Sequence, residues 1–540
     1  MIKQSLSLYR GENTVSTLLA SHKRHDILLF VILFVALLGI TPLLALWGVS
    51  VGISFVLGII AALILAAILV RWPVIGLFLV AASAFMIEEE PLAGTPIFTD
   101  HLYVFYWPPQ LEGFIERPIG ILLLITLLLW IFYRLVQRRP LLQGGALIGP
   151  FVFYMICVFG AVAYGLATGG NIKIVMVQFR PFWYTFLSYI LAYNFVTRKS
   201  HVRNFFWLAI VSAGVKACQG LYIYLILLHG DLTGHDTIMS HEESFFFVAL
   251  LLLIVIFSLH YKYRPQLIAA ICISPVVLIA LIANQRRTDY TALLAGIAVA
   301  WLLVFLLKPW ARRGLITGMI VSIILGGAYI LTFSHSSGSF AAPARAIMAT
   351  FNPSANDTRD ATSNLYRTYE NNDLKYTVTK YPLGLGFGKA FLQPEPLQSL
   401  FPQIIDFDPY YNYVPHNTIY WIWVDLGPIG YFALWLLFGS IVIRGCVIVR
   451  QLKDTYLQVV AIYIVAITVM EVIVAFADYQ LFFYRNVIDL GLLAGLLVKL
   501  PILDQEQDKV QQEVQKEVKK NESTNGVTTP SLPLGGSQYP

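Results

Sequence analysis

Long apolar runs alternate with short polar segments along most of the chain. A membrane-spanning helix needs about 20 mostly apolar residues, because the hydrocarbon core is about 30 Å thick and each helical residue rises about 1.5 Å. Runs near this length lie at residues 27–47, 51–70, 73–86, 118–137, 147–168, 181–197, 204–226, 244–260, 265–284, 291–308, 314–333, 418–443, 456–477 and 482–500. The run 73–86 is short for a span and 181–197 is marginal. The pattern therefore predicts an all-α polytopic membrane protein with about 12–14 transmembrane helices.

Composition supports the same class. Hydrophobic residues make up 57% of the chain and charged residues 13%, whereas a soluble protein carries about 25% charged residues. A soluble domain with one anchor is thus excluded, and the net charge of +6 gives no reason to expect a nucleic-acid partner. The cysteines have neither paired nor metal-ligand spacing, so we predict no disulfide framework and no zinc site.

Basic residues between the runs set the orientation, because cytoplasmic loops are enriched in lysine and arginine. Alternate threading puts the N-terminal tail inside, together with the basic loops at residues 71, 134–139, 198–203, 262–264, 308–313 and 444–453. The acidic segments 88–90 and 242–243 then lie outside, as does the long loop 334–416.

This threading predicts three regions. They are a cytoplasmic tail (1–25), an integral membrane domain (26–500) whose largest extracytoplasmic loop is 334–416, and a cytoplasmic tail (501–540). The last tail is rich in Gln, Glu, Lys, Ser and Pro and has no apolar face, so it is expected to be disordered.

The loop 334–416 carries helical patterns of its own. A helix-compatible stretch surrounds residues 341–350, and the spacing of Leu365, Tyr369, Leu374 and Val378 predicts an amphipathic interfacial helix. The glycine run 384–388 lacks the strand, helix and Lys-Ser/Thr ending of a phosphate-binding loop, so a tight turn against the membrane domain is expected. Aromatic residues in 401–415 suit either an interfacial belt or sugar stacking.

Three arginines break the charge rule on the outer side. Arg180 directly precedes a run that starts at Pro181, and Arg286 and Arg287 lie between two runs. The planar arginine fork matches phosphate oxygens, so these residues could hold a diphosphate, and the helix N-terminus that follows Arg287 adds a positive dipole. The alternative is that Arg286 or Arg287 pairs with Asp289 or with a lipid headgroup.

The loop 334–416 ends where a polar segment meets an apolar helix, at Pro415-His416-Asn417-Thr418. Gly427 and Gly430 follow, which gives the pattern H-N-x(9)-G-x-x-G. A histidine at such a join can meet water while a membrane scaffold holds it. Its ordinary pKa lies near neutral pH, which suits a general base. The alternative is an interfacial residue that caps the helix together with Asn417.

These features together resemble the O-antigen ligase and polymerase superfamily. Its signature is a histidine followed by Asn, Ser or Gln, then nine residues and G-x-x-G, closing a large extracytoplasmic loop. Arg287-Thr288 matches part of an earlier family motif, although Gln285-Arg286 replaces its usual serine. Arg367 and the stretch 382–388 are similar to the family's loop pattern. The resemblance covers about residues 180–450, and the N-terminal third is similar only in being hydrophobic.

The resemblance implies a glycosyltransferase of cell-envelope polysaccharide biosynthesis in the bacterial cytoplasmic membrane. Its donor would be an undecaprenyl-diphosphate-linked glycan, and its acceptor a hydroxyl of a lipid, a glycan or a protein on the outer face. The transfer would be inverting, metal-independent and free of cofactors. His416 would be the base, Asn417 would fix the loop or the acceptor, and the diphosphate would be held by Arg287, Arg180, Arg286 and Arg367. Ligase, polymerase and protein glycosyltransferase differ in their acceptors, so all three remain open.

The competing class is transport, as a lipid-linked oligosaccharide flippase or a polysaccharide exporter. Such proteins have a similar number of spans, but they place charge in a central cavity and keep their loops short. Here the charge falls at the outer face and the long loop ends on a histidine.

Charged and polar residues elsewhere have structural readings. Lys216 could pair with Glu471, and Arg485 could pair with Asp489 one helical turn away. Asp425 lies about 13 Å along the helix from His416, which is too far to orient its ring. The segment 229–243 contains histidines and carboxylates but is interpreted as a polar outer loop rather than a metal site.

Overall fold

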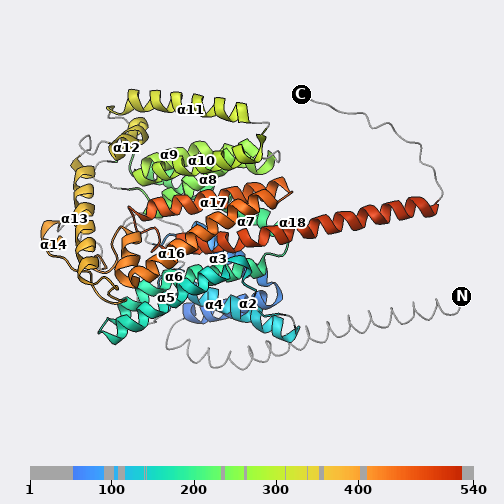
Figure 1. The fold of residues 1–540 in the computed structure, drawn as a ribbon, viewed down its shortest axis with the longest axis horizontal. Coiled ribbons are helices and arrows are strands. Elements are labelled where there is room, and N and C mark those ends of the chain that lie inside the picture. The colour runs from blue at the N-terminus through green and yellow to red at the C-terminus, as the bar shows by residue number, and fades with distance from the viewer. Residues whose placement is uncertain are drawn as a thin grey trace. The chain divides into compact units, whose positions relative to one another are not determined.

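The structure, a computed structural model, contains helices and no strand in the residues that it describes (Figure 1). These residues are 53–89, 103–107, 116–138, 140–141, 143–232, 237–260, 264–309, 312–336, 339–351, 358–401 and 410–525. The predicted tail 1–25, the predicted span 27–47 and the end of the chain from residue 526 lie outside them.

The α-helices follow the predicted apolar runs. They are α2 (Ile53–Arg71), α3 (Pro73–Met86), α4 (Pro118–Val136), α5 (Ile148–Ala167), α6 (Ile172–Phe195), α7 (Lys199–Tyr222), α8 (His241–His260), α9 (Arg264–Ala283), α10 (Arg287–Leu307), α11 (Arg312–Phe333), α12 (Ala342–Phe351), α13 (Thr358–Lys380), α14 (Leu397–Leu400), α16 (Thr418–Gln451), α17 (Thr455–Ala475) and α18 (Tyr484–Asn525). Among the described residues, ten helical segments are long and apolar enough to cross a membrane: those of α4, α5, α7 to α11 and α16 to α18. The all-α polytopic membrane fold is therefore confirmed.

Two compact units divide these helices. The first holds α2, the start of α3 and the end of α4, where the Arg134 guanidinium lies 5.0 Å from the centre of the Trp130 ring. The second unit contains the other helices and every residue that the sequence predicts at the site.

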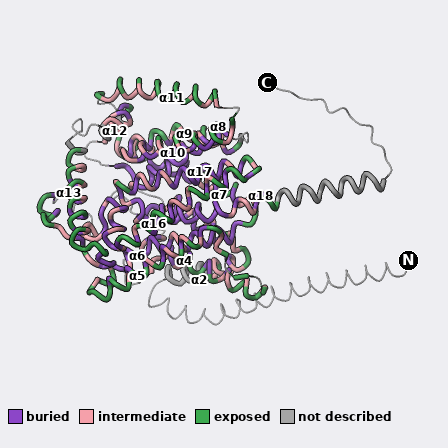
Figure 2. Tube along the Cα trace, in the orientation of Figure 1, coloured by how far each residue is buried: buried purple, intermediate pink, exposed green. Residues whose placement is uncertain are grey.

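The second unit has a buried core and an exterior with many exposed apolar side chains. Most residues of α17 are buried, whereas α11 has no buried residue (Figure 2). Helix α18 packs closely along α6. The two helices are so close that a Cβ added at Gly491 or Gly495 would overlap the backbone carbonyl oxygen of Thr185 or Tyr189. Small residues allow such close approach between membrane helices.

Two predicted helix boundaries are wrong. Helix α6 begins at Ile172, where the Asn171 side chain caps it by accepting from the backbone N–H of Lys173 at 2.9 Å. Pro181 therefore lies inside α6, and Arg180 is buried in the helix rather than at its mouth. Helix α18 continues to Asn525, so residues 501–525 are helical instead of disordered. The sequence 502–525 contains no Gly or Pro and is rich in Gln, Glu and Lys, which favour helix.

The charged residues inside the spans pair differently from the prediction. Lys216 binds Glu88 and lies 3.3 Å from Glu243, not with Glu471. Arg485 binds Glu243 at 2.6 Å and Glu242 at 3.2 Å, not Asp489. Buried charges need partners of opposite sign, and these partners come from segments distant in the sequence.

Helix α16 is broken inside the membrane domain. Gly427 has φ 70° and ψ −172°, which only glycine adopts readily, and Pro428 follows it. The turn after α13 fills the break: the N–H of Leu385 donates to the carbonyl of Val424 at 2.7 Å, and that of Gly386 donates to Asp425 at 3.1 Å. The glycine run thus forms a tight turn against the membrane domain, as the sequence predicts, and satisfies carbonyl groups that the break leaves open.

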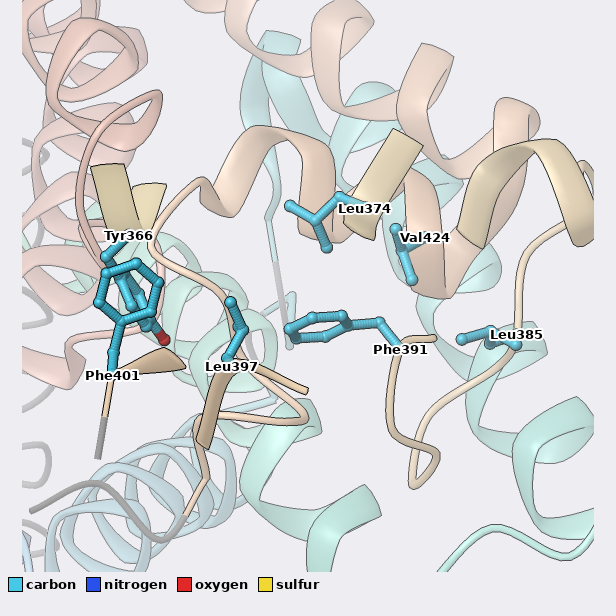
Figure 3. Packing of buried hydrophobic residues seen from close by; sticks show 7 residues of the cluster. All are labelled: Tyr366, Leu374, Leu385, Phe391, Leu397, Phe401 and Val424. Carbon is cyan, nitrogen blue, oxygen red and sulfur yellow. The ribbon is translucent and has the colours of Figure 1, made fainter. Parts of the chain in front are cut away.

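Helix α13 runs across the ends of the membrane helices (Figure 1). A buried apolar cluster holds it on α16, and Figure 3 shows its seven members: Tyr366, Leu374, Leu385, Phe391, Leu397, Phe401 and Val424. The predicted amphipathic helix is present, but its apolar face uses Tyr366, while Leu365 is 51% exposed. This packing places the polar side of α13 against the start of α16.

Candidate functional site

His416 lies directly before α16. Asn417 caps that helix, because its side-chain oxygen accepts from the backbone N–H of Tyr420 at 3.0 Å. The Asn417 amide nitrogen also donates to Asn371 of α13 at 3.0 Å. Asn417 therefore fixes the start of α16 and joins it to α13.

The His416 imidazole is held from one side by α13. Its Nδ1 lies 3.1 Å from Glu370 Oε1, and its backbone N–H donates to Glu370 Oε2 at 3.0 Å. The ring also packs against two tyrosines, with centroid distances of 5.3 Å to Tyr366 and 4.3 Å to Tyr479. Glu370 is buried, whereas the His416 side chain keeps 19% exposure. The imidazole can therefore meet a substrate while its position is fixed.

Charged side chains from four segments surround this histidine. Arg286, at the start of α10, forms an ion pair with Asp478 of the α17–α18 loop. Burial alone would raise the pKa of Asp478, but Arg286, His241 and Arg367 hold it well below its usual range. Asp478 is therefore a carboxylate anion among cationic side chains, and it neutralises part of their positive charge.

Arg367 contributes a half-buried cation one helical turn before Glu370. Burial lowers the pKa of its guanidinium, opposed by the nearby Asp478. Its Nε atom has no hydrogen-bond partner among the described residues. A cation with an unpaired N–H of this kind is stabilised by an anionic ligand.

The structure brings most of the predicted site residues together. Arg287 opens α10 and donates to Asn364 of α13 at 3.4 Å, so it reaches the same helix that carries Arg367 and Glu370. The suggested pairing of Arg286 with Asp289 is replaced by its ion pair with Asp478.

Arg180 belongs to a different set of side chains. It hydrogen-bonds Tyr484, and it lies near Tyr184 and Glu116, which are themselves joined by a hydrogen bond. These partners differ from those of His416, Arg286 and Arg367.

Sequence reasoning missed Glu370, Asp478, Tyr479 and the position of His241. Glu370 follows Arg367 by three residues in a predicted helix, so the two share a face, and this spacing could have revealed it. Asp478 and His241 come from segments distant in sequence, and only their packing brings them to the site.

Residues 276–436 match the family model described as O-antigen ligase. These residues include Arg286, Arg287, Arg367, the glycine turn and the His416 motif. This match supports the resemblance of this part of the chain to the O-antigen ligase superfamily. No curated protein matches the chain. The match supports a membrane glycosyltransferase-like role, with a lipid-linked glycan and an acceptor as the classes of partner.

The surroundings of Asp373 on α13 predict a pH-dependent stability. Burial, with Glu370 and Glu395, raises its pKa from 3.8 to about 7. The folded state therefore keeps a proton that the unfolded state loses, and stability falls as pH rises between about 4 and 7. Asp373→Asn should raise the unfolding midpoint at about pH 8 and leave it unchanged near pH 4. Thermal unfolding in detergent at both pH values checks this, and an equal shift at both would contradict it.

Proposed function

We propose that the protein transfers a glycan from an undecaprenyl-diphosphate-linked donor to a hydroxyl acceptor on the extracytoplasmic face of the bacterial cell membrane. The observation that carries the proposal is the position of His416: its partly exposed imidazole lies near the half-buried Arg286 and Arg367, at the start of α10 and on α13. A base next to cations is what attack on a diphosphate-activated sugar requires.

The proposed reaction is a single displacement. His416 accepts the proton of the acceptor hydroxyl while that oxygen bonds to the anomeric carbon of the donor sugar. The bond between the anomeric carbon and the phosphate oxygen breaks, and undecaprenyl diphosphate leaves with the electron pair. Attack opposite to the leaving group inverts the configuration at the anomeric carbon. A positioned base contributes about 10²–10⁴-fold to such a step.

Arginines supply the charge that the leaving group needs. Arg287, Arg286 and Arg367 would hold the diphosphate, since guanidinium groups bind phosphate oxygens in pairs and stabilise the charge that develops on them. On this proposal no metal or other cofactor is needed. Arg180 keeps a proposed role as a donor ligand on its charge alone, because its observed partners are Tyr484, Tyr184 and Glu116.

Purified protein in nanodiscs tests the proposal. Radiolabelled undecaprenyl-diphosphate glycan is mixed with lipid, glycan and protein acceptors, in a buffer that contains EDTA. Label should move into a product that has lost the diphosphate, and the identity of that product distinguishes ligase, polymerase and protein glycosyltransferase. Transfer that needs added Mg²⁺ would contradict the metal-independent step.

The transport alternative gives a different result. Wild-type protein would then transfer no label in nanodiscs, but in liposomes it would move the labelled lipid across the bilayer. Movement that survives His416→Ala would replace the glycosyltransferase proposal with a flippase.

A further inference from the structure

Glu370 contacts His416 through both of its carboxylate oxygens. Oε2 accepts the backbone N–H of His416 at 3.0 Å, and Oε1 lies 3.1 Å from the ring Nδ1. The Glu370 side chain is 1% exposed, so water does not compete for these oxygens. Nothing in the H-N-x(9)-G-x-x-G pattern points to this residue, because it lies on α13 and not on α16.

A carboxylate can only accept hydrogen bonds. The contact at Oε1 therefore places the proton of the neutral imidazole on Nδ1, which leaves the lone pair on Nε2. Nε2 is the nitrogen that is turned away from Glu370. The tautomer that a general base needs is thus set by a residue that does not itself touch a substrate.

The charges around His416 make this contact more consequential. The groups near it are Arg367 on the same helix as Glu370, Arg286 at the start of α10, His241 at the start of α8, and Asp478 and Tyr479 in the α17–α18 loop. Two of these are arginines, so the surroundings of the ring carry positive charge. Asp478 forms an ion pair with Arg286. Glu370 is the carboxylate in direct contact with the ring, so it offsets the charge of the imidazolium that forms when His416 accepts a proton.

We propose that Glu370 is the positioning residue of a Glu370–His416 dyad: it fixes the Nδ1–H tautomer and stabilises the imidazolium during transfer. The proposal rests on the proposed base role of His416. Glu370 also holds the backbone of His416, while Asn371 holds the side chain of Asn417, so α13 orients both residues of the motif.

Glu370→Gln is the sharpest variant. Glutamine has the same shape but one side-chain acceptor oxygen, so it cannot accept both N–H groups of His416. We expect kcat to fall by about 10²-fold or more, since a wrong tautomer removes most of the action of a base. The KM for the donor should stay within about twofold, because Glu370 does not bind the diphosphate. The acidic limb of the kcat–pH profile should move to lower pH, because the imidazolium loses its anionic partner.

Asp373→Asn is the matched control. It removes a buried carboxyl group one turn further along the same helix. That group interacts with Glu370 through charge, but none of the contacts described above joins it to His416. This variant should keep the wild-type position of the acidic limb. A Glu370→Gln enzyme with wild-type kcat and an unmoved acidic limb would overturn the dyad, and so would an equal loss in both variants.

A spectroscopic readout separates this proposal from the glycosyltransferase proposal. In ¹⁵N-histidine-labelled protein, the His416 signal is assigned by its absence in His416→Ala. Wild type should show the Nδ1–H tautomer, and Glu370→Gln should lose it. If wild type carries the proton on Nε2, the proposal is wrong even when transfer is observed. If the tautomer behaves as expected but no transfer occurs, the positioning role stands and the proposed function fails.

Discussion

His416→Ala is expected to lower kcat for glycan transfer by about 10²–10⁴-fold, the usual contribution of a positioned general base. The KM for the donor should change little, because the arginines and not the imidazole would hold the diphosphate. The measurement is transfer of radiolabelled glycan in nanodiscs at several donor concentrations. A variant that keeps more than about a tenth of wild-type kcat would remove His416 from the base role.

Stability has to be separated from chemistry in this variant. Loss of the imidazole leaves Oε1 of buried Glu370 without its N–H partner, which costs about 1–3 kcal/mol. His416→Asn is the second variant, since the asparagine amide can still donate toward Glu370 but cannot act as a base. It should be folded and equally inactive. His335→Ala, an exposed histidine in the same loop 334–416, should retain wild-type transfer and serves as the matched control.

Gly427→Ala is expected to destabilise the protein by more than about 3 kcal/mol. An alanine would have to adopt φ 70° with ψ −172°, and its Cβ would overlap the carbonyl oxygen of Leu383. The turn that follows α13 would then have to move, and its hydrogen bonds to Val424 and Asp425 would be lost. The check is the thermal unfolding midpoint in detergent, with the yield of folded protein as a second readout.

Gly439→Ala is the control for this prediction. Gly439 lies in the same helix, and a Cβ there would meet no heavy atom within 4 Å. Its effect should be within about 1 kcal/mol, on the stabilising side, since alanine favours helix more than glycine does. Equal unfolding midpoints for Gly427→Ala and Gly439→Ala would show that the break in α16 does not depend on glycine.

The membrane helices of this protein follow from its sequence alone. Apolar length reports a span because backbone groups in lipid must bond within their own helix, and α8, α9 and α17 begin and end within a few residues of their apolar runs. Sequence also predicts α13, from the helical spacing of its apolar residues. It predicts the turn at 384–388 as well, because the glycine run lacks the flanking elements of a phosphate-binding loop. The position of His416 between a polar loop and an apolar helix is also evident from consecutive residues, because the sequence changes from polar to apolar there.

Predictions from local sequence were wrong where packing against another part of the chain decides a helix boundary or a buried face. Pro181 suggests a helix start because proline favours the first turn, but the cap at Asn171 starts α6 earlier and leaves Arg180 buried within the helix. Leu365 fits an amphipathic pattern as well as Tyr366 does, and the packing of Tyr366 against Phe401 and His416 selects the tyrosine.

Composition and periodicity thus determined the class of the protein, its helices and the motif at His416, because each depends on a few consecutive residues and on the thickness of a bilayer. The partners of the buried charged side chains depended on the tertiary structure. Lys216 pairs with Glu88 and His416 with Glu370, and each pair joins segments that are far apart in the sequence. A buried charge is stabilised by any opposite charge that the packing brings within reach, and sequence distance carries no information on which one that is.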